Sequence, residues 1–228
     1  MSRPLIYDRL PPSHDDWIQL YSINSPNGIK IAVALEELGL DYDPHLVNIL
    51  DGDQHTAAFK SVSPNSKIPA SIDPRGPGGQ SIAIMESGAI LIYLAEKTGK
   101  LLPSDAIARN QCLQWLFFQV GHIGPMFGQY EHFFVHAADK CADPYPKERY
   151  GAEAIRLLGV LEDRLAGREF IMDGGYTIAD IATFPWVRSL RERAAGHIEL
   201  ADYPAVDAWL ARCTERPAFA TGRTVCAL

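Results

Sequence analysis

The hydrophobic pattern of this chain changes near residue 103, and that change limits the folds it can adopt. Before residue 103, short apolar runs of strand length alternate with helical segments. After it, only helical spacing continues, and Leu157, Leu161 and Leu165 recur at every fourth position. The helical stretches are residues 106–136, 147–166, 178–195 and 204–216. We therefore expect a mixed α/β domain followed by an all-helical domain.

The first hundred residues predict a definite order of elements. A strand (18–22), a helix (about 29–38) and a second strand (42–48) form a βαβ unit, which implies parallel pairing and a right-handed crossover. Two further strands (68–72 and 81–85) and a helix (87–97) follow. This βαβ-ββα order fits a four-stranded mixed sheet with helices on both faces, which is the thioredoxin-like arrangement. The predicted divisions are an N-terminal arm (1–17), a thioredoxin-like α/β domain (18–103) and an all-α helical domain (104–228).

Composition and charge exclude several classes of protein. Hydrophobic residues make up 47% of the chain and charged residues 21%, a balance typical of globular proteins rather than disordered ones. Nowhere do about 18 apolar residues run uninterrupted, so we expect no membrane span. The N-terminus is charged where a secretory signal would be apolar. The net charge of -7, with no basic run, disfavours nucleic acid and anionic membranes as partners.

The cysteines and histidines do not indicate a metal site. The four cysteines form no CxxC pair, which fits a reducing, cytoplasmic location, and we interpret all of them as packing or surface residues: Cys112, Cys141, Cys213 and Cys226. His132 and His136 lie four residues apart, a spacing compatible with a metal on a helix, but no third ligand is evident. We therefore expect no metal.

Two motifs in the first domain indicate a binding site for a peptide-like anion. In the first, Asn65-Ser66-Lys67-Ile68-Pro69, a proline precedes the third strand. A cis Ile68–Pro69 bond would present the backbone of Ile68 to a peptide ligand, whereas the alternative is an ordinary turn proline. The second, Glu86-Ser87, begins the long helix. Ser87 either caps that helix or helps to hold a carboxylate at its N-terminus.

The turn after the first strand, Ser25-Pro26-Asn27, leads into a helix N-terminus. A hydroxyl and an amide in this position could hold a sulfur anion, because helix N-termini lower the pKa of thiols. The alternative is a plain N-cap followed by proline. No cysteine lies in this turn, so any thiolate there must belong to a ligand.

These motifs, taken in order, resemble a known family. The strand–turn–helix unit, SKIPA, ESGAILIYLAEKTG and the helical second half are together similar to the cytosolic glutathione transferases along almost the whole chain. Closer features resemble the bacterial nu class, which is akin to the fungal nitrogen-regulator-like transferases: YSINSPNGIKI, DGDQ, SPNSKIPA, QWLFFQVGHIGPMFGQ, HFFVHAA, ERY and YTIADIATFPW.

The resemblance implies a role for each matching residue. Ile68 of the Ile68–Pro69 motif would meet the cysteinyl part of glutathione, and Glu86 and Ser87 would hold the γ-glutamyl end. Residues implied for the remaining contacts are Gln54 and Lys67 for the glycyl portion and Arg149 of the helical domain. For Arg149 the alternative is a surface pair with Glu153. Ser25 and Asn27 would contact the sulfur as the catalytic residues, with Ser25 standing where better-known bacterial members carry threonine.

The resemblance also implies an activity and an assembly. The chain is expected to be a glutathione-dependent disulfide-bond reductase that binds one or two glutathione molecules per subunit and works as a homodimer. Two alternatives stay open: conjugation of glutathione to electrophiles as the main activity, and a non-catalytic, glutathione-binding regulatory protein like one fungal relative. The sequence does not separate reduction from conjugation, because both would depend on a second pocket near Trp115, Phe118 and Tyr130.

Two further residues are assigned no chemistry. Tyr21 resembles the catalytic tyrosine of other transferase classes, but strand alternation could equally bury it. Asp180 lies at capping-box spacing from Thr177, so we expect it to cap its helix. Its loss should cost stability, on the order of 1 kcal/mol, before it costs activity.

Overall fold

The computed structural model describes residues 3–193 and 197–228, and contacts group the chain into two compact units. The first unit contains residues 1–100 together with 217–228, and the second contains residues 101–216. We expected residues 217–228 to continue the helical domain, whereas their contacts lie within the first unit. The reason is the short helix α9 (Pro217–Gly222), which packs on α1 (Pro26–Leu38).

The first unit is built on a four-stranded mixed sheet in the order β2-β1-β3-β4. Its strands are β1 (Ile18–Ser22), β2 (Tyr42–Leu46), β3 (Ala70–Asp73) and β4 (Ile82–Met85). β1 pairs with β2 in parallel and with β3 antiparallel, and β3 pairs antiparallel with β4. With α1 between β1 and β2, and α3 (Ser87–Thr98) after β4, the predicted βαβ-ββα thioredoxin-like order is confirmed.

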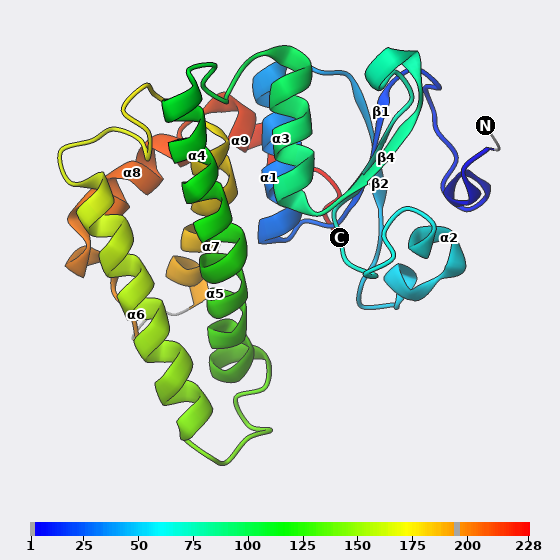
Figure 1. Ribbon diagram of the computed structural model, residues 1–228. Coiled ribbons are helices and arrows are strands. Elements are labelled where there is room, and N and C mark those ends of the chain that lie inside the picture. Colours follow the sequence, from blue (N-terminus) through cyan, green and yellow to red (C-terminus); the bar gives the residue numbers. More distant parts are fainter. Residues whose placement is uncertain (1–2, 194–196) are drawn as a thin grey trace. The chain divides into compact units, whose positions relative to one another are not determined.

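Helices cover both faces of this sheet. Figure 1 shows α1 and α3 on one face and α2 (Ala57–Lys60) on the other. The core under α1 and α3 is apolar and almost fully buried, and includes Leu20, Ile31, Leu35, Ile90 and Leu91. The core on the other face consists of Ile6, Tyr21, Val47, Phe59, Val62, Ala70 and Ile72. Period-two alternation along β1 sends Leu20 to one core and Tyr21 to the other.

The N-terminal arm packs onto the first unit. A 3-10 turn at Leu5–Asp8 buries Ile6 completely in the core beside Tyr21. Farther along the arm, the buried carboxylate of Asp43 on β2 accepts hydrogen bonds from the backbone N–H groups of Ser13 (2.8 Å) and His14 (2.7 Å). The arm lacks periodicity because its order comes from these contacts with the sheet rather than from helix or strand propensity.

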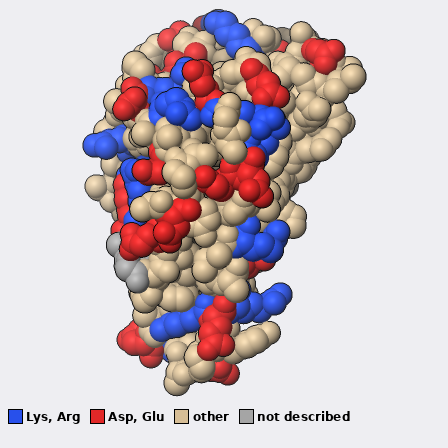
Figure 2. All heavy atoms as spheres, turned by 90° about the vertical axis from the view of Figure 1, so that its left-hand side faces the viewer, with Lys and Arg blue, Asp and Glu red and all other residues tan. Residues whose placement is uncertain are grey.

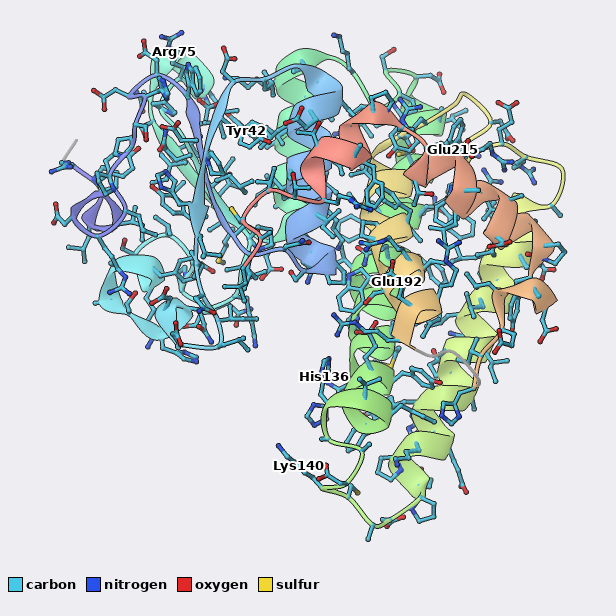
Figure 3. The ribbon with its side chains drawn as sticks, turned by 180° about the vertical axis from the view of Figure 1, so that it is seen from behind. Tyr42, Arg75, His136, Lys140, Glu192 and Glu215 are labelled. Atoms are coloured by element: carbon cyan, nitrogen blue, oxygen red, sulfur yellow. The ribbon has the colours of Figure 1, made fainter. Side chains whose placement is uncertain are left out.

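Hydrogen bonds and an ion pair join α3 and α1 to the sheet at the edge where β1 begins. Lys97 Nζ lies 2.7 Å from Asp73 Oδ2, and Tyr93 donates to the same oxygen at 2.5 Å. Tyr42, which Figure 3 labels, donates to Glu36 Oε1 at 2.6 Å and so joins β2 to α1. These bonds lie at the carboxyl ends of the two helices and leave their N-termini for other contacts.

The second unit is helical, as predicted. Its main helices are α4 (Ala106–Phe118), α5 (Gly124–Glu131), α6 (Tyr145–Leu165), α7 (Ile178–Arg193) and α8 (Pro204–Thr214). π-helical segments follow α4 (Gln119–Ile123) and α5 (His132–His136), so the predicted helix at 106–136 is interrupted twice. The apolar faces meet in a core that includes Leu116, Phe127, Leu157, Leu161, Phe184 and Trp209.

The surface carries charges of both signs. On the face that Figure 2 shows, basic and acidic side chains lie interspersed without one large area of a single sign. Within residues 3–193 and 197–228, no helix is both long and apolar enough to cross a membrane. In the same described ranges, no group of three or more His, Cys, Asp or Glu residues is placed to hold a metal ion.

Candidate functional site

The strand register brings the three sequence motifs of the first unit to one edge of the sheet. Tyr21 of β1 lies opposite Ala70 of β3, and Ala70 lies opposite Met85 of β4. Pro69, just before β3, and Glu86, just after β4, therefore lie at the edge where β1 ends. The turn into α1 starts from the same edge, so the cis-proline loop, the start of α3 and the start of α1 converge.

The turn between β1 and α1 is held tightly against the strand. Ser25 is the N-cap of α1, and its Oγ accepts a hydrogen bond from Gly28 N at 3.3 Å. The hydroxyl hydrogen of Ser25 remains available as a donor, because accepting uses only a lone pair. Asn27 is the second residue of the helix and is half-buried. A Cβ at Gly28 would lie 2.0 Å from Ile23 O, so only glycine fits there.

The Ile68–Pro69 peptide bond is cis. The loop before it is ordered by Ser63, whose Oγ donates to Lys67 O at 2.8 Å and whose carbonyl accepts from Ser66 N at 2.8 Å. Lys67 is exposed and Ile68 is half-buried. β3 begins at Ala70, two residues later than predicted, because proline has no N–H for the ladder.

Glu86 and Ser87 join β4 to α3 in a way that differs from a simple serine cap. Glu86 occupies the cap position with φ 70° and ψ 120°, and its side chain makes no capping bond. Ser87 is the first helical residue, so the interpretation of Ser87 as the N-cap is wrong. The Glu86 carboxylate is exposed, and Asn65 Nδ2 donates to its Oε1 at 3.4 Å.

Behind this corner lies Lys30, which we did not predict to be part of the site. Its side chain is fully buried in α1, and Nζ donates to Ser87 Oγ at 3.2 Å. Burial lowers the pKa of Lys30 to about 7, against the opposing effect of the nearby Glu86 carboxylate. The signal in the sequence was a lysine inside the apolar run Ile29 to Leu35.

Gln54 follows β2 in a 3-10 turn at Asp53–His55. Its Nε2 donates to Ile49 O at 3.3 Å, whereas its Oε1 is buried without a hydrogen-bond partner within the described part of the chain. A buried acceptor without a partner is uncommon and is often satisfied by water or a ligand. Gln54 is thus suited to accept a hydrogen bond from a bound molecule.

Arg149 belongs to the second unit, where it is exposed on α6. It lines a groove of about 560 Å³ together with Met126, Tyr145, Tyr150 and Arg156, among others. Glu153, the alternative partner considered for Arg149, is instead held by Arg156 through two hydrogen bonds of 2.8 Å. Arg149 therefore lines a groove in which the carboxylate of Glu153 is already bound by Arg156.

Tyr21 lies in the core rather than at the site edge. Its ring stacks on His45 with 4.7 Å between centroids, and burial raises the pKa of its hydroxyl. That hydroxyl is buried and, among the described residues, has no hydrogen-bond partner. Tyr21 thus belongs to the core under α2, with no part in the convergent edge.

The two histidines of the second unit, His132 and His136, both contact neighbouring side chains. His136 Nε2 lies 2.9 Å from Arg193 Nη1, so the ring faces a guanidinium (Figure 3 labels His136). His132 packs edge-on against Phe133. A metal ion at His136 would have to displace the arginine.

A thioredoxin-like sheet with a cis-proline edge, followed by a helical unit, defines a class of protein. Residues 24–97 match the family model of the glutathione S-transferase N-terminal domain, and residues 144–212 match that of the glutathione S-transferase C-terminal domain. The chain belongs to the glutathione S-transferase family.

Individual relatives are similar over nearly the whole chain. Disulfide-bond oxidoreductase YfcG of Escherichia coli is 47% identical over 203 residues, which cover 88% of this chain and 92% of that protein. A glutathione transferase of Pseudomonas putida, solved with one glutathione disulfide per subunit, is 48% identical with a TM-score of 0.95, covering 97% of this chain and 96% of that one. A family member from Pseudomonas fluorescens Pf-5, solved with two glutathione molecules, is 50% identical with a TM-score of 0.95, covering 98% and 100%.

Proposed function

We propose that this protein is a glutathione-dependent disulfide-bond reductase. The observation that carries the proposal is the turn Ser25–Asn27, which offers a hydroxyl and a helix N-terminus to an anion but contains no cysteine. The reactive sulfur must then come from a bound thiol. The similarity to YfcG, which is named a disulfide-bond oxidoreductase, and to relatives solved with glutathione supports glutathione as that thiol.

Each part of glutathione is assigned to a part of the convergent edge. The cysteinyl part lies along the backbone of Ile68, beside Pro69, with its sulfur near Ser25 and Asn27. The γ-glutamyl end meets Glu86 and Ser87, where the exposed carboxylate of Glu86 suits the ligand ammonium. Gln54 and Lys67 are assigned to the glycyl end, whereas a contact with Arg149, which belongs to the second unit, stays a prediction from the family resemblance.

The reaction is thiol–disulfide exchange. A glutathione thiolate attacks one sulfur of the substrate disulfide, forming a mixed disulfide and expelling the other sulfur as a thiolate, which takes a proton from solvent. A second glutathione thiolate then attacks the mixed disulfide, releasing oxidised glutathione and the second substrate thiol. Two electrons pass from two glutathione molecules to the substrate. Because two thiols are consumed, room for two glutathione molecules, or one oxidised one, is expected.

The catalytic roles of Ser25 and Asn27 can be tested by substitution. We expect Ser25→Ala and Asn27→Ala to be retained on a glutathione column but to reduce 2-hydroxyethyl disulfide about 10- to 100-fold more slowly, the range for a lost hydrogen bond to a charged group. Ser81→Ala, at an exposed serine of the same unit, is the matched control and should keep the full rate. Unchanged turnover in both site variants would remove these roles.

Retention on the glutathione column and turnover of two test substrates together separate the alternative functions. Conjugation as the main activity predicts rapid transfer of glutathione to 1-chloro-2,4-dinitrobenzene with little disulfide reduction. A non-catalytic regulatory protein predicts retention on the column without turnover of either substrate. A chain that neither binds nor reacts would contradict the proposed ligand itself.

We further propose a nu-class homodimer that works in the cytoplasm. The four cysteines are free, which suits a reducing compartment where reduced glutathione is plentiful. A twofold dimer is the commonest closed assembly for a chain of this kind. Sedimentation should give twice the chain mass of 25.2 kDa, and a single species at the chain mass would contradict the dimer.

A further inference from the structure

The buried lysine behind the proposed glutamyl site has no place in the chemistry described so far. Lys30 is only 1% exposed, although a buried ammonium costs several kcal/mol unless it is well paired. Its Nζ donates to Ser87 Oγ at 3.2 Å, across the contact between α1 and α3. Ser87 is also buried and begins α3, where backbone N–H groups point toward the site edge.

The direction of this hydrogen bond controls what Ser87 can offer a ligand. A serine hydroxyl has one hydrogen to donate and lone pairs with which to accept. When the Lys30 ammonium donates to Oγ, the hydroxyl hydrogen is free to point elsewhere. A neutral lysine has a lone pair of its own, and the Ser87 hydrogen can then turn back toward it. The charge on Lys30 thus decides whether Ser87 donates outward.

We propose that Lys30 is a positioning residue of the glutamyl site, whose ammonium aligns the Ser87 hydroxyl to donate to the α-carboxylate of glutathione, and that the carboxylate in turn draws a proton onto Lys30. The inference rests on the proposed function, because it assumes that the glutamyl end binds at Ser87. It adds to that function a coupling between ligand binding and proton uptake.

The charged groups around Lys30 make this coupling specific. The helices packed on α1 are α3 and α9, and α9 carries no ionisable side chain. Besides Lys30, the ionisable side chains of α1, of α3 with its cap and of the segment after α9 are Glu36, Glu37, Glu86, Tyr93, Glu96, Lys97, Arg223 and Cys226. Tyr93 donates to Asp73. Glu36 accepts from Tyr42 and Lys97 pairs with Asp73, both at the far ends of their helices. Glu86 is the carboxylate that acts on Lys30 and favours its charged form.

In the free protein, burial lowers the pKa of Lys30 to about 7. A bound carboxylate beyond Ser87 favours the charged form and raises that pKa. By linkage, binding above about pH 7 takes up a proton, and binding well below it does not.

Titration calorimetry on the wild-type protein tests this directly. The ligand is S-methylglutathione, which keeps the glutamyl end but has no thiol to release a proton. Binding enthalpies measured in phosphate and in Tris give the protons exchanged. We expect uptake approaching about one proton at about pH 8 and close to none at about pH 6. Binding without uptake at pH 8 overturns the inference and leaves the proposed function intact, whereas no binding at either pH contradicts the proposed function.

Two variants separate positioning from packing. Lys30→Met keeps an unbranched side chain without charge, and should bind S-methylglutathione about 10- to 100-fold more weakly with no proton uptake. Lys30→Arg keeps a charge at every pH and should recover part of the affinity, also without uptake. Lys100→Met, at an exposed lysine of the same unit, should behave as wild type. Uptake that persists in Lys30→Met would assign the proton to another group and overturn the inference; if neither variant folds, the wild-type titration decides.

Discussion

At the scale of single residues, Glu86 has a backbone conformation that its side chain disfavours. Its φ of 70° and ψ of 120° lie where glycine is the residue normally found. Such a conformation costs on the order of 1–3 kcal/mol and persists only when the surroundings impose it. Glu86 is the single residue between β4, which ends at Met85, and α3, which begins at Ser87, and it is exposed at the convergent edge.

This conformation predicts opposite effects of one substitution on stability and on binding. Glu86→Gly should raise the free energy of unfolding by about 1 kcal/mol, since glycine relieves the positive φ. The same variant should lose glutathione affinity, because the ammonium of the ligand loses its carboxylate. Glu86→Gln keeps the Cβ and should match wild type in urea unfolding while also binding more weakly. A Glu86→Gly protein less stable than Glu86→Gln would contradict the argument.

Single residues were also the scale at which the sequence was least informative. The residue types at Ser25, Asn27, Ile68 and Glu86 predicted a site for a peptide-like anion. Hydroxyls, amides, carboxylates and the backbone before a proline each form characteristic hydrogen bonds or ion pairs with such a ligand. Lys30 stood out only as a lysine within an apolar run, and that pattern alone does not indicate a site, because a lysine in an apolar helix ordinarily extends its ammonium to solvent. Only the packing of α3 against α1 shows that its ammonium stays inside and meets Ser87.

At the scale of elements, Asp180 does more than cap α7. Its Oδ2 accepts from Thr177 N at 2.9 Å and Thr177 Oγ1 at 3.1 Å, which confirms the predicted capping box. Its Oδ1 accepts from Ile171 N at 2.8 Å and from Trp209 Nε1 at 2.9 Å. One buried carboxyl group therefore joins the start of α7, the preceding loop and α8.

We expect Asp180→Ala to cost about 3 kcal/mol or more, well above the value of an N-cap alone, because several buried donors lose their acceptor together. Urea unfolding measures this cost. Asp163→Ala, at an exposed aspartate of α6, is the control and should stay within about 0.5 kcal/mol of wild type. Equal effects of the two substitutions would show that Asp180 acts only as an ordinary surface aspartate.

Periodicity predicted the long elements well and the short ones poorly. The strands and the helices α1, α3, α6, α7 and α8 follow from apolar spacing, because each buries one face. The helix α9 and the arm through Ile6 have too few residues for a period to show. Their order comes from tertiary contacts, as at Gly222, where an added Cβ would lie 2.9 Å from Val33 N. The π-helical segments likewise leave no mark on hydrophobic spacing.

At the scale of the whole molecule, the sequence predicted a mixed α/β part followed by a helical part, and the chain folds into two compact units of these kinds. The return of residues 217–228 to the first unit was not predictable, because sequence patterns describe neighbours along the chain and not distant partners. Placing the reactive sulfur on glutathione is likewise a statement about the whole molecule, since it requires that no cysteine anywhere in the protein supplies it.

The most direct test of that claim removes the accessible protein thiols. Cys112 and Cys213 are fully buried, whereas Cys141 and Cys226 are partly exposed. Burial also raises the pKa of Cys226 to about 11, which leaves it mostly protonated at neutral pH. We predict that a Cys141→Ser/Cys226→Ser protein reduces 2-hydroxyethyl disulfide with glutathione at the wild-type rate. A folded double variant whose rate falls to that of glutathione alone would show that a protein cysteine carries the reaction, and would contradict the account.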